Sequence, residues 1–227
     1  YQQGVLAIDQ GVGRLLEALQ ATGQDENTLI VFTSDQGFAW GQKGFKSKVA
    51  PYRANVEAPM IIRMPGAIAD QSAGRVIEEP IAGVDIVPTF FAQAGIELPW
   101  EMHGYDLSPL LGAEDKAWEY PALLVHTAKQ FGSDTNNVPP AGDPRLIHGP
   151  GIPWYVMLCE GEYKYIRNLI EGETEELYHM DDDPEEVVNL AQLAVHQETL
   201  KKFRSQAIDE LRRTKAGMVD NLSLIHI

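Results

Sequence analysis

An aspartate and a glutamine stand side by side directly after an apolar stretch of the sequence. The stretch reads TLIVFTSDQG, which places Asp35 and Gln36 just beyond residues 28–33. Carboxylate and amide oxygens are hard ligands, and they suit Ca²⁺ or Mg²⁺ better than Zn²⁺. Ligands of open α/β sheets gather outside the carboxyl ends of the strands, so a strand over residues 28–33 would predict a metal site here. A plain turn at DQG, in which Gly37 lets the chain turn back sharply, explains the same letters.

A group of lysines follows the aspartate. The segment GQKGFKSK contains Lys43, Lys46 and Lys48. The chain as a whole is acidic, with 18 Lys and Arg against 33 Asp and Glu, so a basic group beside a carboxylate suggests a pocket for an anion. A solvated loop of lysines fits the same charge pattern.

The composition is that of a globular protein with enough apolar residues for a core. Of the 227 residues, 44% are hydrophobic. The formal net charge of −15 argues against a nucleic acid or an anionic membrane as partner, because both would be repelled. No apolar run approaches the roughly 18 residues that a membrane span needs, so we expect no membrane association. The single cysteine, Cys159, excludes an internal disulfide.

The first half of the chain alternates helical and strand patterns. Apolar residues at spacings of three and four predict a helix over residues 3–21. The unbroken apolar run at 28–33 is typical of a parallel strand with both faces covered. A second strand is expected at 59–63, and a helix at 85–94 with Asp85 as its N-cap. These segments predict an α/β fold.

The second half has strand patterns without intervening helices, which favours antiparallel pairing. The expected strands are 122–127, 154–159, 163–167 and 176–180, with a hairpin at EGE, residues 160–162. Residues 129–153, rich in Gly, Pro, Asn and Asp, predict a long surface loop. After DDDPEE the chain is expected to be helical to about Thr214, with the aspartates at the positive end of the helix dipole.

Several separate motifs, in order, resemble the second half of the catalytic domain of a type I sulfatase, of the alkaline phosphatase superfamily. They are Asp9 with Gly13, TLIVFTSDQG, GQKGFKSK, PYRANVEAPMIIRMPG, VDIVPTFFAQAGI and GYDLSPLLG. EYKYIRN and EELYHMDDDPEEVVNLA resemble the C-terminal subdomain of the same family. The resemblance runs from residue 1 to about residue 195 and rests on the agreement of these motifs in spacing.

The resemblance implies a fold and a division of the chain. Residues 1–112 would be the C-terminal part of the catalytic domain, an α/β domain with an alkaline-phosphatase-like mixed sheet flanked by helices. Residues 113–220 would form a small subdomain of an antiparallel sheet and a helix. Residues 221–227, NLSLIHI, form an apolar tail for which a non-native segment and a frayed terminus are both open.

The resemblance also implies an activity, the hydrolysis of sulfate esters with a formylglycine nucleophile and one Ca²⁺ ion. Asp35 and Gln36 match the metal ligands of the family, and Lys48 matches the lysine that contacts the sulfate. A fixed ammonium would offset charge on the sulfuryl oxygens as the ester bond breaks. Lys43 stands where many members have His, so we give it no catalytic or metal role. Where the family often has Glu followed four residues later by Arg, this chain has Arg53 and Glu57, with the two charges exchanged. A helix would keep this pair in contact.

The nucleophile motif of the family, Cys-x-Pro-Ser-Arg, has no counterpart in this sequence. Cys159 lies in VMLCEG, a strand pattern, and is interpreted as structural. The formylglycine is therefore expected in sequence preceding Tyr1, and the chain alone is expected to be inactive.

Two rival functions stay open. One is a phosphoester or phosphonate hydrolase of the same superfamily, because a metal loop and a lysine serve any tetrahedral oxyanion. The other is a non-catalytic binding or structural protein on the same fold. The substrate on the first hypothesis is a small-molecule or carbohydrate sulfate ester, and the location implied by the family is periplasmic, extracellular or lysosomal. Whether His126 or His148 reaches substrate, and the oligomeric state, are not indicated.

Overall fold

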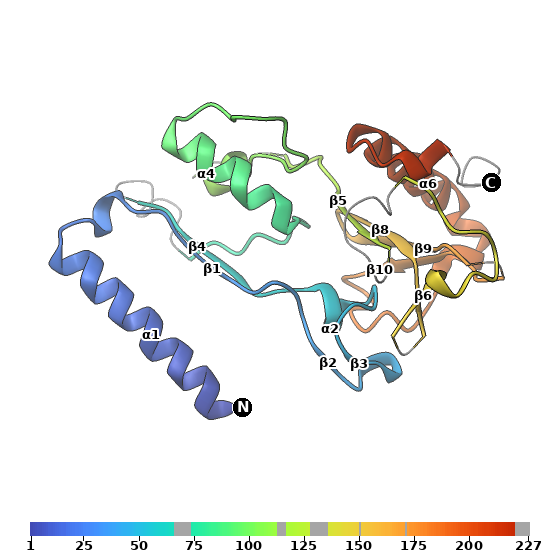
Figure 1. Cartoon of the computed structure of the whole chain (residues 1–227), viewed down its shortest axis with the longest axis horizontal. Coiled ribbons are helices and arrows are strands. Elements are labelled where there is room, and N and C mark those ends of the chain that lie inside the picture. The colour runs from blue at the N-terminus through green and yellow to red at the C-terminus, as the bar shows by residue number, and fades with distance from the viewer. Residues whose placement is uncertain (66–73, 113–116, 128–135, 150, 171, 221–227) are drawn as a thin grey trace. The chain divides into compact units, whose positions relative to one another are not determined.

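A computed structural model of the chain describes residues 1–65, 74–112, 117–127, 136–149, 151–170 and 172–220 (Figure 1). The chain divides into two compact units, which are described separately. Unit 1 contains Tyr1–Ser34, Pro59–Ile77 and Pro109–Lys116, and unit 2 contains Asp35–Ala58, Glu78–Ser108 and Ala117–Ile227. The domain boundary at residue 112 stays a prediction, and the tail at 221–227 lies outside the described residues.

Unit 1 begins with a long amphipathic helix. Helix α1 (Gln2–Ala21) confirms the helix predicted from the apolar spacing, and it ends at Thr22, whose hydroxyl donates to the carbonyl of Ala18 at 2.9 Å. None of its residues is buried. A short 3-10 turn, η1 (Asp25–Asn27), then leads into the first strand. Within the described ranges, no helix is both long enough and apolar enough to cross a membrane.

Strand β1 (Ile30–Thr33) pairs with β4 (Met60–Arg63), and the two lie side by side in Figure 1. The pairing is antiparallel, with Ile30 opposite Arg63 and Thr33 opposite Met60. Both predicted strands are therefore present. The parallel direction expected for β1 is not found in this pair, and the strand is half-buried or exposed rather than covered on both faces. An unbroken apolar run specifies a strand but not the direction of its partner.

Unit 2 begins with the segment that follows β1 in the chain. Strands β2 (Ala39–Trp40) and β3 (Lys46–Ser47) pair antiparallel around the 3-10 turn η2 (Gln42–Gly44). Helix α2 (Arg53–Val56) follows as one short turn. These elements carry the lysines singled out in the sequence.

Helix α4 (Ile86–Ala94) confirms the predicted helix, and it follows η3 (Gly83–Asp85). Asp85 stands at the N-cap position, but its carboxylate does not cap α4. It accepts hydrogen bonds from the backbone N–H groups of Ala82 and Tyr105, both at 2.7 Å. Asp85 therefore ties two loops together.

The second half of the chain forms an antiparallel sheet, as predicted. The four strands lie in the order β10-β9-β8-β5, and a tight turn at Gly161 (φ 52°) joins β8 to β9. Their bounds are β5 (Ala122–His126), β8 (Tyr155–Glu160), β9 (Tyr163–Asn168) and β10 (Glu176–His179). The loop predicted at 129–153 is only partly described, and it contains a short strand pair, β6 (Ile147–His148) with β7 (Ile152–Pro153). Other short helices in the described residues include α5 (Ser108–Leu111), η5 (Pro144–Leu146) and η8 (Gly217–Asp220).

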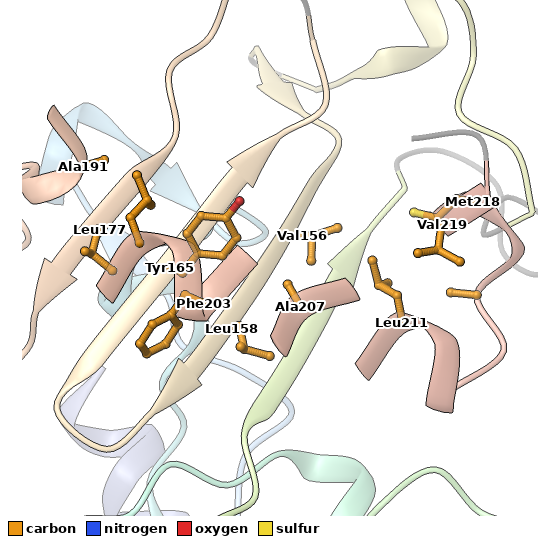
Figure 2. Packing of buried hydrophobic residues seen from close by; sticks show 12 residues of the cluster. Val156, Leu158, Tyr165, Leu177, Ala191, Phe203, Ala207, Leu211, Met218 and Val219 are labelled. Carbon is orange, nitrogen blue, oxygen red and sulfur yellow. The ribbon is translucent and has the colours of Figure 1, made fainter. Parts of the chain in front are cut away.

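Helix α6 (Gln197–Arg213) covers one face of this sheet. Figure 2 shows its Phe203 and Ala207 beside Leu158 and Tyr165 of the strands. These side chains are almost fully buried. Because alternate residues of a strand face opposite sides, the neighbours of these strand residues are available to pack on the other face. The predicted antiparallel sheet with a helix packed on it is thus confirmed, and its separation as a subdomain stays a prediction.

The helix begins later than predicted. Two 3-10 turns, η6 (Leu190–Gln192) and η7 (Ala194–His196), precede α6, so the aspartate run does not lie at a helix N-terminus. Instead the carboxylate of Asp183 accepts hydrogen bonds from the N–H groups of Val187 at 3.0 Å and Val188 at 2.8 Å. The prediction of a helix-dipole role for the run was wrong, because α6 begins only at Gln197 and Asp183 closes a turn instead.

The second face of the sheet packs against the segment that contains the lysines. A buried cluster joins Ala50 to Tyr155, Met157 and Ile166 of the strands, with Tyr52 at its edge. This face therefore supports residues 45–56.

Buried charges also connect the sheet to this segment. The Nζ of Lys164 on β9 lies 2.6 Å from Oε1 of Glu186, and both side chains are 2% exposed. The other carboxylate oxygen of Glu186 accepts from the N–H of Arg53 at 2.8 Å, at the start of α2. Glu176 of β10 accepts from the hydroxyl of Tyr52 at 3.2 Å. The segment is therefore attached by hydrogen bonds to ionised groups, which are stronger than neutral ones.

We expect Lys164→Met to lower the free energy of unfolding by about 3–5 kcal/mol, because it leaves the Glu186 carboxylate buried without its counter-charge. The double variant Lys164→Met/Glu186→Gln removes both charges and should lose less than the single variant. Urea unfolding of the purified chain followed by circular dichroism measures both. A single variant within about 1 kcal/mol of wild type would contradict the interpretation of a buried pair.

Candidate functional site

Asp35 and Lys48 are brought together by the fold of unit 2. The Nζ of Lys48 donates to Oδ2 of Asp35 at 2.9 Å, and the side chains are 40% and 69% exposed. Oδ1 of the same carboxylate accepts the backbone N–H of Gln36 at 2.9 Å. An ion pair this exposed is worth at most about 1 kcal/mol, so an incoming ion can displace either partner.

Asp35 and Gln36 offer the oxygen chemistry of a hard-cation site but only a part of one. Ca²⁺ takes 6–8 oxygen ligands, typically carboxylates, carbonyls and waters. Over the parts of the chain that the structure describes, no three His, Cys, Asp or Glu side chains are grouped closely enough to hold a metal ion. The carboxylate and its neighbouring amide fit the donor type of a Ca²⁺ site, and further ligands would have to complete the coordination.

Gly37 lets the DQG loop lie directly against α2. A Cβ at this position would be 2.4 Å from the carbonyl oxygen of Ala54 and 2.8 Å from that of Glu57. Gly37 does not have a positive φ, so its role is close approach rather than the sharp turn expected from the sequence. The glycine thereby fixes the backbone next to Asp35.

Lys48 lies between two residues with unusual backbone angles. Ser47 has φ 77° and Val49 has φ 88°. Side chains other than glycine rarely adopt such angles, and for a β-branched residue they are a true outlier. Each costs on the order of 1–3 kcal/mol and persists only where the surroundings impose it, as happens at functional sites. The backbone on both sides of the lysine is therefore held in place.

Comparisons with known proteins identify the family. Residues 1–96 match the family model described as Sulfatase. The chain is 32% identical over 226 residues to N-acetylglucosamine-6-O-sulfatase of Bacteroides thetaiotaomicron, with 94% of this chain aligned. The chain belongs to the sulfatase family. It spans about 35% of the length of that relative.

Solved structures of similar proteins support the same fold. One, described as a complex with its substrate D-glucosamine-2-N,6-O-disulfate, superposes with a TM-score of 0.72 at 28% identity, covering 93% of this chain and 39% of that one. The phosphonate monoester hydrolase of Agrobacterium radiobacter gives a TM-score of 0.67 at 23% identity, covering 90% of this chain and 41% of its own. The second likeness concerns the fold alone. The predicted α/β fold of the alkaline phosphatase superfamily is confirmed.

In this sulfatase-family chain, Lys43 packs against other residues and does not share a site with Lys48. Its Nζ lies 4.3 Å from the ring centre of Tyr52 and 3.4 Å from the hydroxyl of Tyr178, and it donates to the carbonyl of Glu186. These contacts stabilise the packing of the segment on the sheet through charge, hydrogen bonding and the aromatic faces. The three lysines of the sequence therefore do not form one pocket.

The exchanged pair Arg53 and Glu57 is in contact, as predicted. Nη2 of Arg53 lies 3.2 Å from Oε1 of Glu57, and the second hydrogen bond comes from Nε of the same guanidinium. Helix α2 supplies the spacing that brings the two side chains together. Because both are about half exposed, the pair orients α2 more than it stabilises it.

His126 and His148, on β5 and β6, lie against each other. Their ring centres are 5.5 Å apart with the planes perpendicular, and His126 also packs 5.2 Å from the ring of Tyr155. Burial, and secondarily His148, lowers the pKa of His126 to about 4, so its imidazole is neutral at pH 7. The contact between these two residues could not be predicted from the sequence, because a long connection separates them in the chain.

Cys159 lies on β8, an inner strand of the sheet, and its residue surface is half-buried. Burial raises the pKa of its thiol to about 11, which disfavours the thiolate that a nucleophile requires.

The substitution Gly37→Ala tests the close approach of the DQG loop to α2. The added methyl group would collide with two backbone carbonyls, so we expect a loss of about 1–3 kcal/mol in the free energy of unfolding. Gly83→Ala is the matched control in the same unit, because nothing lies within 4 Å of its Cβ position and its φ is not positive. Equal losses for the two variants in urea unfolding would refute the packing role of Gly37.

Proposed function

We propose that the chain contributes the metal loop and the sulfate-binding lysine of a sulfatase, an enzyme that hydrolyses sulfate esters. The contact of 2.9 Å between Asp35 and Lys48 carries the proposal, because the family resemblance gives these residues adjacent roles. The carboxylate that binds the cation and the ammonium that binds the sulfate must lie close together, because the bound cation and the sulfate are neighbours. Family membership adds the reaction class.

In the proposed reaction, Asp35 and Gln36 would hold one Ca²⁺ ion through their side-chain oxygens. The ammonium of Lys48 would leave the Asp35 carboxylate and bind the sulfate group of the substrate. There it would offset negative charge on the sulfuryl oxygens as the ester bond breaks. Calcium would supply further positive charge for the sulfate, and the formylglycine expected outside this sequence would supply the nucleophile. Neither Lys43 nor Cys159 takes part.

A sulfated sugar is the substrate class that we favour. The relative at 32% identity is named as an N-acetylglucosamine-6-O-sulfatase, and the structure at 28% identity holds a glucosamine disulfate as substrate. The net charge of −15 repels an anionic ligand at long range, so its affinity must come from local positive charge such as that of Lys48.

We expect Lys48→Ala, in the full-length protein, to lower kcat/KM for sulfated N-acetylglucosamine at least about ten-fold, because one charge contact to the transition state is lost. Lys201→Ala, on the exposed side of α6, removes the same charge elsewhere and should leave the rate unchanged. Release of sulfate measured by ion chromatography gives both rates.

An unchanged rate in Lys48→Ala would remove this residue from the site. A wild-type protein that hydrolyses a phosphonate monoester but no sulfate ester would instead favour the rival phosphonate hydrolase. A protein that binds Ca²⁺ and turns over neither ester would favour the non-catalytic rival.

A further inference from the structure

The two strained residues beside Lys48 are each held through their backbone carbonyl. The Nδ2 of Asn55 donates to the carbonyl of Ser47 at 2.8 Å, and the hydroxyl of Tyr155 donates to the carbonyl of Val49 at 2.7 Å. The carbonyls thus bracket the lysine on both sides. A backbone with φ 77° and φ 88° at these two positions needs such fixed partners.

The two donors are buried and come from different parts of unit 2. Asn55 lies on α2 and Tyr155 on β8, and each is 1% exposed. Burial raises the pKa of Tyr155 above its usual range, so the phenol keeps the proton that it donates. Tyr155 lies 106 residues from Val49 in the sequence, so the antiparallel sheet reaches into the loop that carries Lys48.

The hydrogen bonds are separable from packing. The Tyr155 ring already belongs to the buried cluster with Ala50 and Met157, and its hydroxyl adds a directed contact at the edge of that cluster. Asn55 retains a buried Oδ1 with no hydrogen-bond partner among the described residues. An unused buried acceptor is unfavourable, so an amide here is explained by the bond that its nitrogen donates.

We infer that Tyr155, assisted by Asn55, is a positioning residue for the proposed reaction. It fixes the carbonyl of Val49 and thereby holds the ammonium of Lys48 where it can meet Asp35 or a sulfate group. This inference rests on the proposed function for its catalytic consequence. Displacement of a catalytic group by about 1 Å can reduce a rate a hundred-fold, so a single hydroxyl that holds the backbone beside Lys48 can affect the rate.

The test is Tyr155→Phe, which removes the hydroxyl and keeps the ring. Tyr165→Phe is the matched control, because Tyr165 is also fully buried and also loses one hydrogen bond, from its hydroxyl to Glu175 at 2.5 Å. The first measurement is amide hydrogen exchange of residues 47–50 by mass spectrometry. We expect exchange there to be at least about five-fold faster in Tyr155→Phe than in wild type or in Tyr165→Phe.

The second measurement is steady-state kinetics of the full-length enzyme with a sulfate ester. Tyr155→Phe should lower kcat about ten-fold with KM changed by less than about two-fold, and Tyr165→Phe should keep the wild-type kcat. Equal exchange at 47–50 in both variants, or faster exchange without a fall in kcat, would overturn the inference. If wild type itself turns over no sulfate ester, the proposed function fails, and the exchange data alone decide whether Tyr155 holds the Lys48 backbone.

Discussion

The backbone on either side of Lys48 adopts positive φ angles that Ser47 and Val49 would not keep by themselves, and the geometry of the site depends on this constraint. Buried groups of the antiparallel sheet impose it. Tyr155 holds one carbonyl, and the pair of Lys164 and Glu186 fastens the start of α2. The sheet of the second half of the chain is thus part of the support of the site.

The ion pair between Asp35 and Lys48 differs from these buried contacts, because it is exposed and a ligand can displace either partner. A rigid backbone with a weakly paired carboxylate and ammonium suits a site that binds a cation and an anion together, because little interaction is lost when each group takes its ligand. The buried pair of Lys164 and Glu186, at 2% exposure, could not be exchanged in this way. On the proposed function, the buried pair supports the site and the exposed pair binds the ligands.

The sequence allowed the local elements to be predicted, and the structure supplied what depends on distant contacts. Strands β5, β8, β9 and β10 followed from their strand-like sequences and the turns between them, and the contact of Arg53 with Glu57 from helical spacing. The direction of β1 did not follow, because an apolar run is the same in either direction. The bond of Tyr155 to Val49 had no signal at all, because it joins residues 106 apart through a single hydroxyl.

The most direct measurement is a calcium titration of the full-length protein by calorimetry, comparing wild type with Asp35→Asn and Lys48→Met. If the Asp35 carboxylate binds the cation, Asp35→Asn weakens Ca²⁺ binding at least about ten-fold. Lys48→Met removes the competing ammonium, so it keeps or strengthens the binding of Ca²⁺. Calcium affinity that is unchanged in Asp35→Asn, or reduced equally in both variants, would contradict the assignment of the metal to this carboxylate.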